Sequence, residues 1–496
     1  MNLSISGIVR TTLVTAAGAG LVVGAMHSQG AFAVASTRAV DTATGSATSP
    51  VRSASLVCPG PELKGLKGVA DLDVGVRVAA AAAPVRAMTG TAPAAAPGEV
   101  SLSRMPRGSL GAPVTARGVS LLADQTRAES VLVSGTESMA AGVAAAQNWL
   151  VPSGDQRSLG GAACGQPGAD FWIMAGGGAP GRQERLLLTN PGGNAVTVDV
   201  TLHGAKGALS SPNGKGIVVP AHGRTAFLLD SINSDLANPV VHVVADGGVV
   251  GAVVNDLWLD GARAGGSDDA VPTAAPSRDQ VIPAVAADGQ AVLRVAVPGN
   301  DEAVVQARVL TAQGPRALPA GGVIRIDGGT VTDIDISALP VGTYGLQVRA
   351  DMPIVAAAVV TRTAPGKPGD FAWTSSTPPI TGVAGMPLAV PEGTSAPIQR
   401  SLSVTASGDT ASVEVVTVDA QGVETSRRPE VGVDATAVLD VTGATSVWVH
   451  RVGGNGQVRA GVVSWLDDAQ GRLITATPLR DTALRTTTVG LREVSH

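Results

Sequence analysis

The chain has 496 residues, a length that allows roughly three to five domains of ordinary size. Its hydrophobic share of 44% includes only 4 Phe, 1 Tyr and 6 Trp, so its cores must be built from small and β-branched side chains, which suit β-sheets. The 35 basic and 40 acidic residues give a net charge of −5 without a basic block. This balance argues against nucleic acid as a partner, because that affinity depends on Lys and Arg.

The first 33 residues have the pattern of an export signal. Arg10 precedes the apolar stretch 11–26, and Ala31-Phe32-Ala33 forms a small-x-small cleavage site. The apolar stretch is short for a spanning helix, which needs about 20 residues, although counting from Ile5 keeps an uncleaved anchor open. We therefore expect an extracytoplasmic protein, secreted or in the cell envelope, which meets the membrane only through this segment if the segment remains uncleaved.

Two cysteines, Cys58 and Cys164, fit this location. Exported proteins meet oxidising conditions, so an even pair predicts one disulfide, with two unrelated buried thiols as the alternative. The bond would join the two ends of the first domain. Closing a loop of about 100 residues contributes up to about 4.7 kcal/mol in the chain-entropy model.

Alternating apolar residues mark strands along most of the chain. The stretch 185–207 contains an apolar strand, a Pro-Gly-Gly turn and a run of alternating Val and Leu from 196 to 202. This pattern predicts a hairpin with one buried face. Similar patterns recur at 293–314 and 402–422, so we expect repeated domains.

A second pattern, of strand, tight turn and strand, indicates how many domains there are. It recurs in residues 130–149, 239–258, 344–360 and 446–463. These four expected hairpins predict four units of about 100 residues each. A last short strand is expected to close each unit, in residues 170–172, 269–271, 370–373 and 472–475.

The fold class that these patterns predict is all-β, with about four tandem immunoglobulin-like or fibronectin-like β-sandwiches lying end to end. A closed arrangement, such as a propeller built from the same hairpins, is the alternative. The expected domains are a signal peptide or anchor (1–33), a disordered stalk (34–55), β-sandwich unit 1 (56–178) with an Ala/Pro-rich loop insertion at 79–97, units 2 (179–277), 3 (278–381) and 4 (382–482), and a C-terminal tail (483–496).

No group of residues in the sequence names a chemistry. No two histidines have metal-ligand spacing and no nucleophile elbow is present, so we expect no catalytic residue, no metal site and no cofactor. Acidic pairs could hold calcium or serve glycoside hydrolysis, but Asp is also favoured in turns, and we prefer that interpretation. The pairs are Asp268 with Asp269, Asp467 with Asp468, and Asp333 with Asp335.

The scarce aromatic residues are candidates for core packing or for ligand contact. Trp172, Trp373 and Trp465 lie near the expected unit boundaries. We interpret them as core residues, and contact with a glycan or another ligand is the alternative. Their exposure to solvent distinguishes the two interpretations.

Three motifs resemble a known family. Ser55-Leu-Val-Cys-Pro-Gly-Pro61, Ala163-Cys-Gly-Gln-Pro-Gly-Ala-Asp-Phe-Trp172, and Leu188-Thr-Asn-Pro191 followed by alternating Val are similar to an exported actinobacterial family catalogued as domain of unknown function 5719. The family has no established activity. The resemblance therefore implies an extracytoplasmic location and supplies no site.

From these patterns we expect a non-catalytic protein of the cell envelope that acts as a structural or scaffold module. A binding module for a glycan or for an envelope protein is the first alternative. A hydrolase with a site between domains is the second, and it would need two carboxylates that face each other across a cleft.

Overall fold

The computed structural model describes residues 47–488, apart from Thr89, Thr91, Ala175, Ala320, Glu392, Gly393 and Ser395. The expected signal segment (1–33) lies outside these residues, as do residues 34–46 and 489–496. Over the described part the chain is all-β, as predicted, with strands, short 3-10 helices and no α-helix. None of the helices described there has the length and apolar character needed to cross a bilayer.

Residues 49–486 form one compact unit. Its strands fall into four sets, and each set consists of two antiparallel groups of strands that face each other across a hydrophobic core. The first set, with the strand that precedes it, comprises β1 (Ala47–Pro50), β2 (Ser53–Cys58), β3 (Val76–Ala82), η1 (Val85–Ala87), β4 (Val100–Arg104), β5 (Leu121–Gln125), β6 (Val131–Thr136), η2 (Glu137–Met139), β7 (Val143–Val151) and β8 (Ser158–Ala163).

The second set comprises β9 (Asp170–Met174), β10 (Arg182–Asn190), β11 (Val196–Gly204), β12 (Gly207–Leu209), η3 (Pro212–Gly214), β13 (Ile217–Val219), β14 (Gly223–Leu228), η4 (Leu229–Ser231), β15 (Val240–Asp246), β16 (Gly251–Asp260) and β17 (Arg263–Ala270). The third set comprises β18 (Ser277–Ala287), β19 (Gln290–Ala296), β20 (Ala303–Thr311), β21 (Gly314–Ala317), β22 (Val323–Ile326), β23 (Val331–Asp335), β24 (Gly342–Arg362) and β25 (Asp370–Ser375).

The fourth set, with the strand that follows it, comprises β26 (Val383–Pro387), β27 (Gln399–Ser407), β28 (Ala411–Val418), β29 (Glu424–Arg427), β30 (Glu430–Val431), β31 (Ala435–Asp440), β32 (Ser446–Gly454), β33 (Gln457–Asp468), β34 (Gly471–Pro478), β35 (Asp481–Thr482) and β36 (Arg485–Thr488).

The four sets share one strand order. In the second set, β12-β11-β15-β9 faces β14-β10-β16-β17. In the first set, β4-β6-β2 faces β5-β3-β7-β8, and in the fourth set, β28-β32-β26 faces β31-β27-β33-β34. In the third set the 21-residue strand β24 takes part in both faces. Its first half pairs with β18 and β20, and its second half pairs with β19 and β25.

The expected hairpin at 185–207 forms both of its strands, but they do not pair. β10 pairs with β14 and β16, whereas β11 pairs with β12, β13 and β15. Residues 191–195 therefore carry the chain across the core to the facing sheet, a separation of about 10 Å that a few residues can span. Alternation reveals which face of a strand is buried, but not its partner, and so the hairpin interpretation is wrong.

The same correction applies to the second repeated pattern. β6 and β7 lie in different sheets, as do β15 and β16, and β32 and β33. The hairpins that form are instead β7 with β8, β16 with β17, β24 with β25, and β33 with β34.

Three further expectations differ from the structure in the first set. Residues 170–172 lie in β9, which pairs with β15 in the second set, and the strand that closes the first set is β8. β8 was missed because its Ser-Leu-Gly-Gly-Ala-Ala sequence does not alternate. Ala79–Ala82, expected in a loop, completes β3, where small side chains permit close packing. β2 begins at Ser53, inside the expected stalk.

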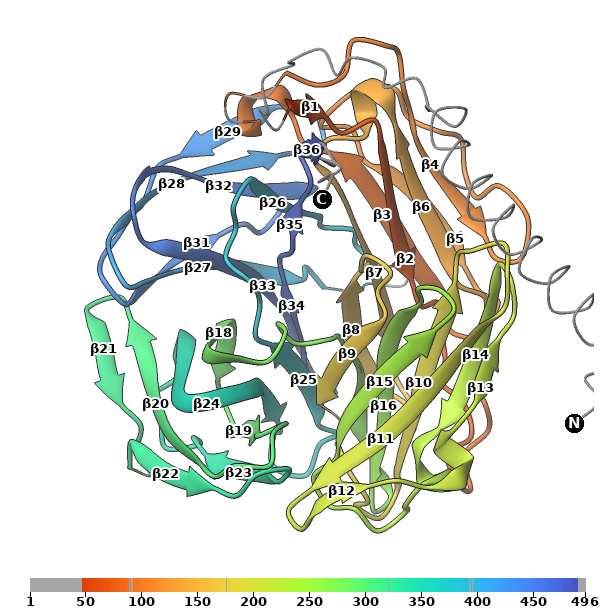
Figure 1. Cartoon of the computed structure of the whole chain (residues 1–496), viewed down its shortest axis with the longest axis vertical. Coiled ribbons are helices and arrows are strands. Elements are labelled where there is room, and N and C mark those ends of the chain that lie inside the picture. Colours follow the sequence, from red (N-terminus) through yellow and green to blue (C-terminus); the bar gives the residue numbers. More distant parts are fainter. Residues whose placement is uncertain are drawn as a thin grey trace, which may run out of the picture. The chain divides into compact units, whose positions relative to one another are not determined.

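Within residues 49–486 the sets close into a ring (Figure 1). Each set contacts the next, and β26 of the fourth set contacts β3 and β7 of the first. A shared cluster that includes Ala87 and Met88 of the first set and Val416 and Trp448 of the fourth seals this junction. The end-to-end arrangement expected from the sequence is therefore wrong, and the arrangement is closed.

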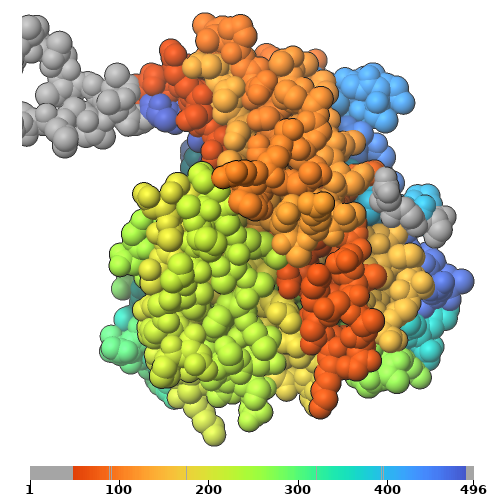
Figure 2. Space-filling model, turned by 90° about the vertical axis from the view of Figure 1, so that its right-hand side faces the viewer, coloured from red at the N-terminus to blue at the C-terminus, as the bar shows by residue number. Residues whose placement is uncertain are grey.

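The first set also lies against the second set. Figure 2 shows the first set in orange beside the second set in yellow-green, with the red-orange segment 59–75 lying along the second set. In this segment Glu62 is paired with Arg224 at 2.8 Å and with Arg185 at 3.8 Å. Glu62 is buried, so these ion pairs hold the segment in place on β10 and β14.

Candidate functional site

Four edge strands meet at the centre of the ring. β8, β17, β25 and β34 each end a sheet, and each contacts at least two of the others. The outer edge of such a strand carries backbone N–H groups without a strand partner, and leaving them unpaired away from water costs free energy. Two buried carboxylates, of Asp268 in β17 and Asp370 in β25, accept hydrogen bonds from these groups.

Asp268 contacts all three other sets at once. Its Oδ1 accepts hydrogen bonds from the Gly161 N–H in β8 at 3.4 Å and from the Thr475 hydroxyl in β34 at 3.0 Å. Its Oδ2 accepts a hydrogen bond from the Trp373 N–H in β25 at 2.8 Å. The Asp268 side chain is fully buried, so this one carboxyl group joins four strands inside the protein.

Asp370 has a similar role on the neighbouring strand. Its Oδ2 accepts hydrogen bonds from the N–H groups of Leu159 in β8 and Ile474 in β34, both at 3.0 Å. Burial raises the pKa of the Asp268 and Asp370 carboxyls well above their usual range. Carboxyls with raised pKa often mark functional sites, but these two are inaccessible to solvent and bind backbone amides. Their geometry assigns them to ring closure.

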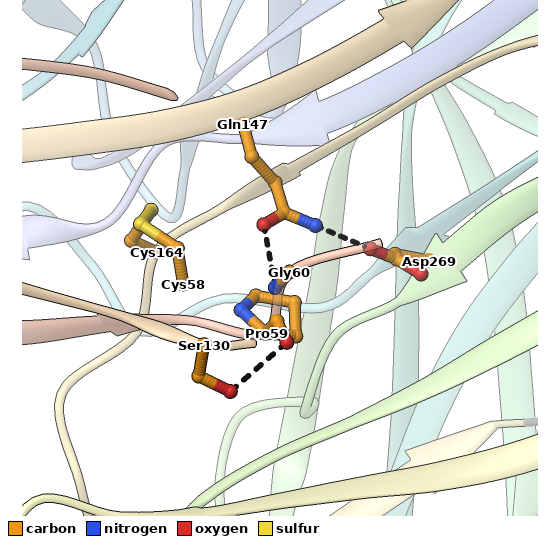
Figure 3. Close-up of a disulfide and its surroundings, with 7 residues drawn as sticks. All are labelled: Cys58, Pro59, Gly60, Ser130, Gln147, Cys164 and Asp269. Atoms are coloured by element: carbon orange, nitrogen blue, oxygen red, sulfur yellow. Dashed lines mark hydrogen bonds between the residues drawn. A yellow bond between two sulfur atoms is a disulfide. The ribbon is translucent and has the colours of Figure 1, made fainter. Parts of the chain in front are cut away.

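The disulfide lies beside this centre, in the first set. Cys58 and Cys164 are bonded with an S–S distance of 2.02 Å, and the bond joins the end of β2 to the residue that follows β8 (Figure 3). Next to it, the backbone of Val57 and Gly165 exchanges hydrogen bonds of 2.8 and 3.0 Å. The expected pairing of the two cysteines is therefore present.

The buried side-chain amide of Gln147 forms hydrogen bonds both to the segment beside the disulfide and to the second set. The Gly60 N–H donates to Gln147 Oε1 at 2.9 Å, and Gln147 Nε2 donates to Asp269 Oδ2 at 2.9 Å (Figure 3). Asn255 Nδ2 donates to the other oxygen of Asp269 at 2.9 Å. Asp268 and Asp269 lie in a buried strand rather than in a turn, so the turn interpretation was wrong for this pair. An acidic pair inside a Gly-rich and Ala-rich strand was the signal that could have revealed it.

Three of the four other acidic candidates bind arginine. Asp468 pairs with the buried Arg157 at 2.8 Å, and Asp467 pairs with Arg362 at 2.9 Å, in each case across a boundary between sets. Asp333 pairs with Arg294 at 2.8 Å, and the Asp335 carboxylate accepts the Ser337 N–H. Across the described residues no group of three or more His, Cys, Asp or Glu side chains could hold a metal ion.

An open groove of about 760 Å³ separates the first set from the fourth. On one side it is lined by Arg77 in β3, by residues 117–120 before β5 and by Leu122. On the other side lie residues 388–390 and Arg400 of the fourth set, together with the turns that follow β28 and β31. A groove of this size matches the sites that proteins use for small ligands or short peptides. The sequence patterns did not predict it, because its two walls are more than 250 residues apart along the chain.

Comparison with known families shows which family the chain belongs to. The sequence model described as "Family of unknown function (DUF5719)" matches residues 119–442, which is more than half of the chain. This chain belongs to the DUF5719 family. The match includes Asp268 and Asp370 at the centre of the ring, and also Cys164, while Cys58 precedes it.

Other comparisons add little for this DUF5719 member. No curated protein matches the chain. The crystal structure of Thermotoga maritima 1070 is 14% identical, covers 20% of this chain and 93% of its own, and has a TM-score of 0.18. A tetra-tandem repeat from the extending region of a large adhesion protein is 13% identical, covers 78% of this chain and 92% of its own, and has a TM-score of 0.10. At these TM-scores neither structure supports a statement about the fold.

The three tryptophans that were singled out lie in different surroundings in this DUF5719 chain. Trp172 is 7% exposed and stacks on His242 with ring centroids 4.1 Å apart. Trp373 is 2% exposed, and its indole N–H donates to Asp256 Oδ2 at 2.9 Å. Trp465 is partly buried against the cluster shared by the third and fourth sets. Trp172 and Trp373 therefore pack inside the protein, and among the three Trp465 has the most accessible ring.

Weak quenching of tryptophan fluorescence by acrylamide is the result that follows from this placement. Trp149, Trp172, Trp373 and Trp448 are buried, and Trp258 and Trp465 are partly buried. Stern–Volmer analysis of the native protein should show most of the emission protected, and denaturant should remove the protection. Full accessibility in the native state would contradict the packing.

The Glu184 side chain makes the free energy of unfolding depend on pH. Burial and the neighbouring Asp256 raise the pKa of Glu184 from its usual 4.5 to about 7, and burial raises the pKa of Asp269 from 3.8 to about 6. Between about pH 4.5 and about pH 7 the native state holds a proton on Glu184 that the unfolded chain has released. This contribution to the free energy of unfolding is therefore present at low pH and lost as the pH rises through 7.

The Glu184→Gln variant isolates this contribution. His203 and His450, whose pKa values are lowered by burial, act in the opposite direction in the wild type, and comparison with the variant cancels their effect. We expect wild type to lose more stability than Glu184→Gln between about pH 5 and about pH 7.5, as measured by guanidinium unfolding. Equal losses would show that Glu184 is already ionised at pH 5.

Proposed function

We propose that this protein is a non-catalytic structural or scaffold module that acts outside the cytoplasm. The observation that carries the proposal is the single carboxyl group of Asp268, which binds the three other strand sets. These hydrogen bonds and the ion pairs between sets support the view that the four sets form one rigid body and do not move as flexibly linked domains. A rigid body with a large outer surface suits a protein that holds other molecules in place.

The domain count and the location belong to this proposal. Each strand set encloses its own hydrophobic core between two faces, which supports four immunoglobulin-like or fibronectin-like sandwiches. The disulfide supports a location in an oxidising compartment, and residues 1–33 have the pattern of an export signal. A membrane contact through that segment, and an actinobacterial origin, belong to the same proposal.

Photo-crosslinking in intact cells tests the scaffold role. A photoreactive residue placed at Val218, Val323 or Val423, which are 58%, 61% and 57% exposed, samples the second, third and fourth sets without disturbing a core. We expect at least one position to give a discrete adduct with an envelope protein, in the fraction outside the cytoplasm. The absence of adducts from all three positions, or a cytoplasmic location, would overturn the proposal.

A binding module for an envelope protein is the second candidate function, and the groove between the first and fourth sets favours it. A glycan is less well matched, because none of the described residues that line the groove is aromatic. Sugar rings commonly pack their apolar faces on aromatic side chains.

A further inference from the structure

The groove between the first and fourth sets holds a buried cation that has no acidic partner among the residues that the structure describes. Arg400 is 5% exposed and lines the groove. Its Nη2 donates to the Ala389 carbonyl at 2.7 Å, and within the described residues its Nε and Nη1 have no hydrogen-bond partner. A guanidinium group has five N–H donors arranged to bind a carboxylate with two parallel hydrogen bonds. Arg400 is therefore positioned to receive an anion from outside the chain.

A second guanidinium group adds positive charge to the same groove. Arg117 donates to the carbonyls of Ala83, Ser138 and Ala141 at 2.8, 2.7 and 2.6 Å, and none of these acceptors carries a charge. Burial lowers the pKa of both Arg117 and Arg400 to about 10. An anion bound beside Arg400 would recover part of this cost.

The walls of the groove include large apolar side chains that are open to water. Leu122, Val119 and Val390 are 51%, 47% and 45% exposed, although each is a large hydrophobic residue. They come from both sides of the groove. An occupant with an apolar side chain would remove this surface from water, and this burial favours binding.

The edge strand beside the groove favours an extended chain as the occupant. β5, which carries Leu122, ends its sheet and pairs only with β3 among the described strands. A strand edge offers N–H and C=O groups to an incoming peptide, which can add as a further strand. The Ser120 hydroxyl, at the start of β5, is buried and has no hydrogen-bond partner within the described residues. Unpaired polar groups therefore lie beside the apolar walls.

We propose that this groove binds an extended peptide segment of a partner protein, which places a carboxylate against Arg400 and an apolar side chain against Leu122. The inference rests on the proposed scaffold function and gives the chemistry of the partner. The carboxylate comes either from the C-terminus of the partner or from an Asp or Glu side chain, and the two sources need separate probes.

Binding to the purified full-length protein tests the proposal. The probes are three pentapeptide libraries with Val, Leu or Ile at two positions: one with a free C-terminus and no acidic residue, one with an internal Asp and an amidated C-terminus, and one amidated without any acid. Affinity selection should enrich peptides from one of the two acidic libraries. The best peptide, labelled and titrated by fluorescence anisotropy, should bind at least about ten-fold more tightly than its neutral amide.

Matched variants locate the contact. Arg400→Gln and Leu122→Asp should each weaken the best peptide by at least about ten-fold, while Val323→Asp, at an equally exposed position of the third set, should leave the affinity unchanged. Because Leu122 is exposed, its substitution tests the groove even if Arg400→Gln fails to fold.

Three results would overturn the proposal: no peptide with a Kd below about 1 mM, equal binding by Leu122→Asp, or Arg400-dependent binding of a uronate oligosaccharide or phosphatidylglycerol vesicles in place of peptides. Failure of the peptides while the crosslinks at Val218, Val323 or Val423 persist would reject the groove alone. If the peptides bind but none of the three positions gives a crosslink, the scaffold function would be rejected instead.

Discussion

The Asp268→Ala variant is expected to lose about 3 kcal/mol or more of its free energy of unfolding, because three buried donors lose their acceptor at once. These donors are the N–H groups of Gly161 and Trp373 and the hydroxyl of Thr475, each from a different strand set. The truncation also leaves a small cavity at the centre of the ring, which adds to the loss. Asp268→Asn keeps one acceptor oxygen and should lose less.

Guanidinium unfolding measures this loss, and Asp301→Ala, at an exposed position of the third set, is the matched control with an expected change within about 0.5 kcal/mol. Hydrogen exchange gives a second readout that a general loss of stability would not produce. Peptides that contain Gly161 and Trp373 should exchange faster in Asp268→Ala than in a variant of equal stability. Unchanged exchange at both amides would show that Asp268 does not close the ring.

Removal of the disulfide in a Cys58→Ser, Cys164→Ser double variant should cost about 2 to 4 kcal/mol, the second large effect. The two cysteines are 106 residues apart, so the bond restricts a long loop in the unfolded chain. In the native state the hydrogen bonds between Val57 and Gly165 keep the same ends together without it. The double variant should therefore keep its fold and unfold at a lower guanidinium concentration.

Because both cysteines are buried, the wild-type protein is reduced in guanidinium and the released thiols are counted. After this reduction its stability should equal that of the double variant, which controls for the serine substitutions themselves. Thiol labelling of the purified protein in denaturant should find no free cysteine. Two reactive thiols per chain, or equal stability before and after reduction, would show that the bond contributes nothing in the protein as it is made.

Strand positions were largely predictable, because a half-buried strand must alternate. The run from Val196 to Leu202 forms β11, and the patterns at 293–314 and 402–422 likewise contain strands. Strand partners were not predictable in the same way. β10 and β11 both bury residues in one core, and that pattern is the same whether two strands lie in one sheet or in facing sheets.

The centre of the ring escaped prediction for a different reason. Asp268 accepts hydrogen bonds from residues 105, 107 and 207 positions away, and no local pattern encodes such contacts. Turn propensity was the wrong guide here, because Gly265, Gly266 and Ser267 precede the Asp pair and these residue types are also favoured in turns. The groove depends on the same closure, because Leu122 and Arg400 come together only when the first and fourth sets meet.

Ring closure also brings together the two ends of the compact unit. The Val51 N–H donates to the Leu484 carbonyl at 3.2 Å, so entry and exit of the compact unit are neighbours. A tensile force applied between these two points would first break that contact, without drawing the four strand sets into a line. The compact unit therefore extends little under such a force, unlike an extensible tether of the same number of residues.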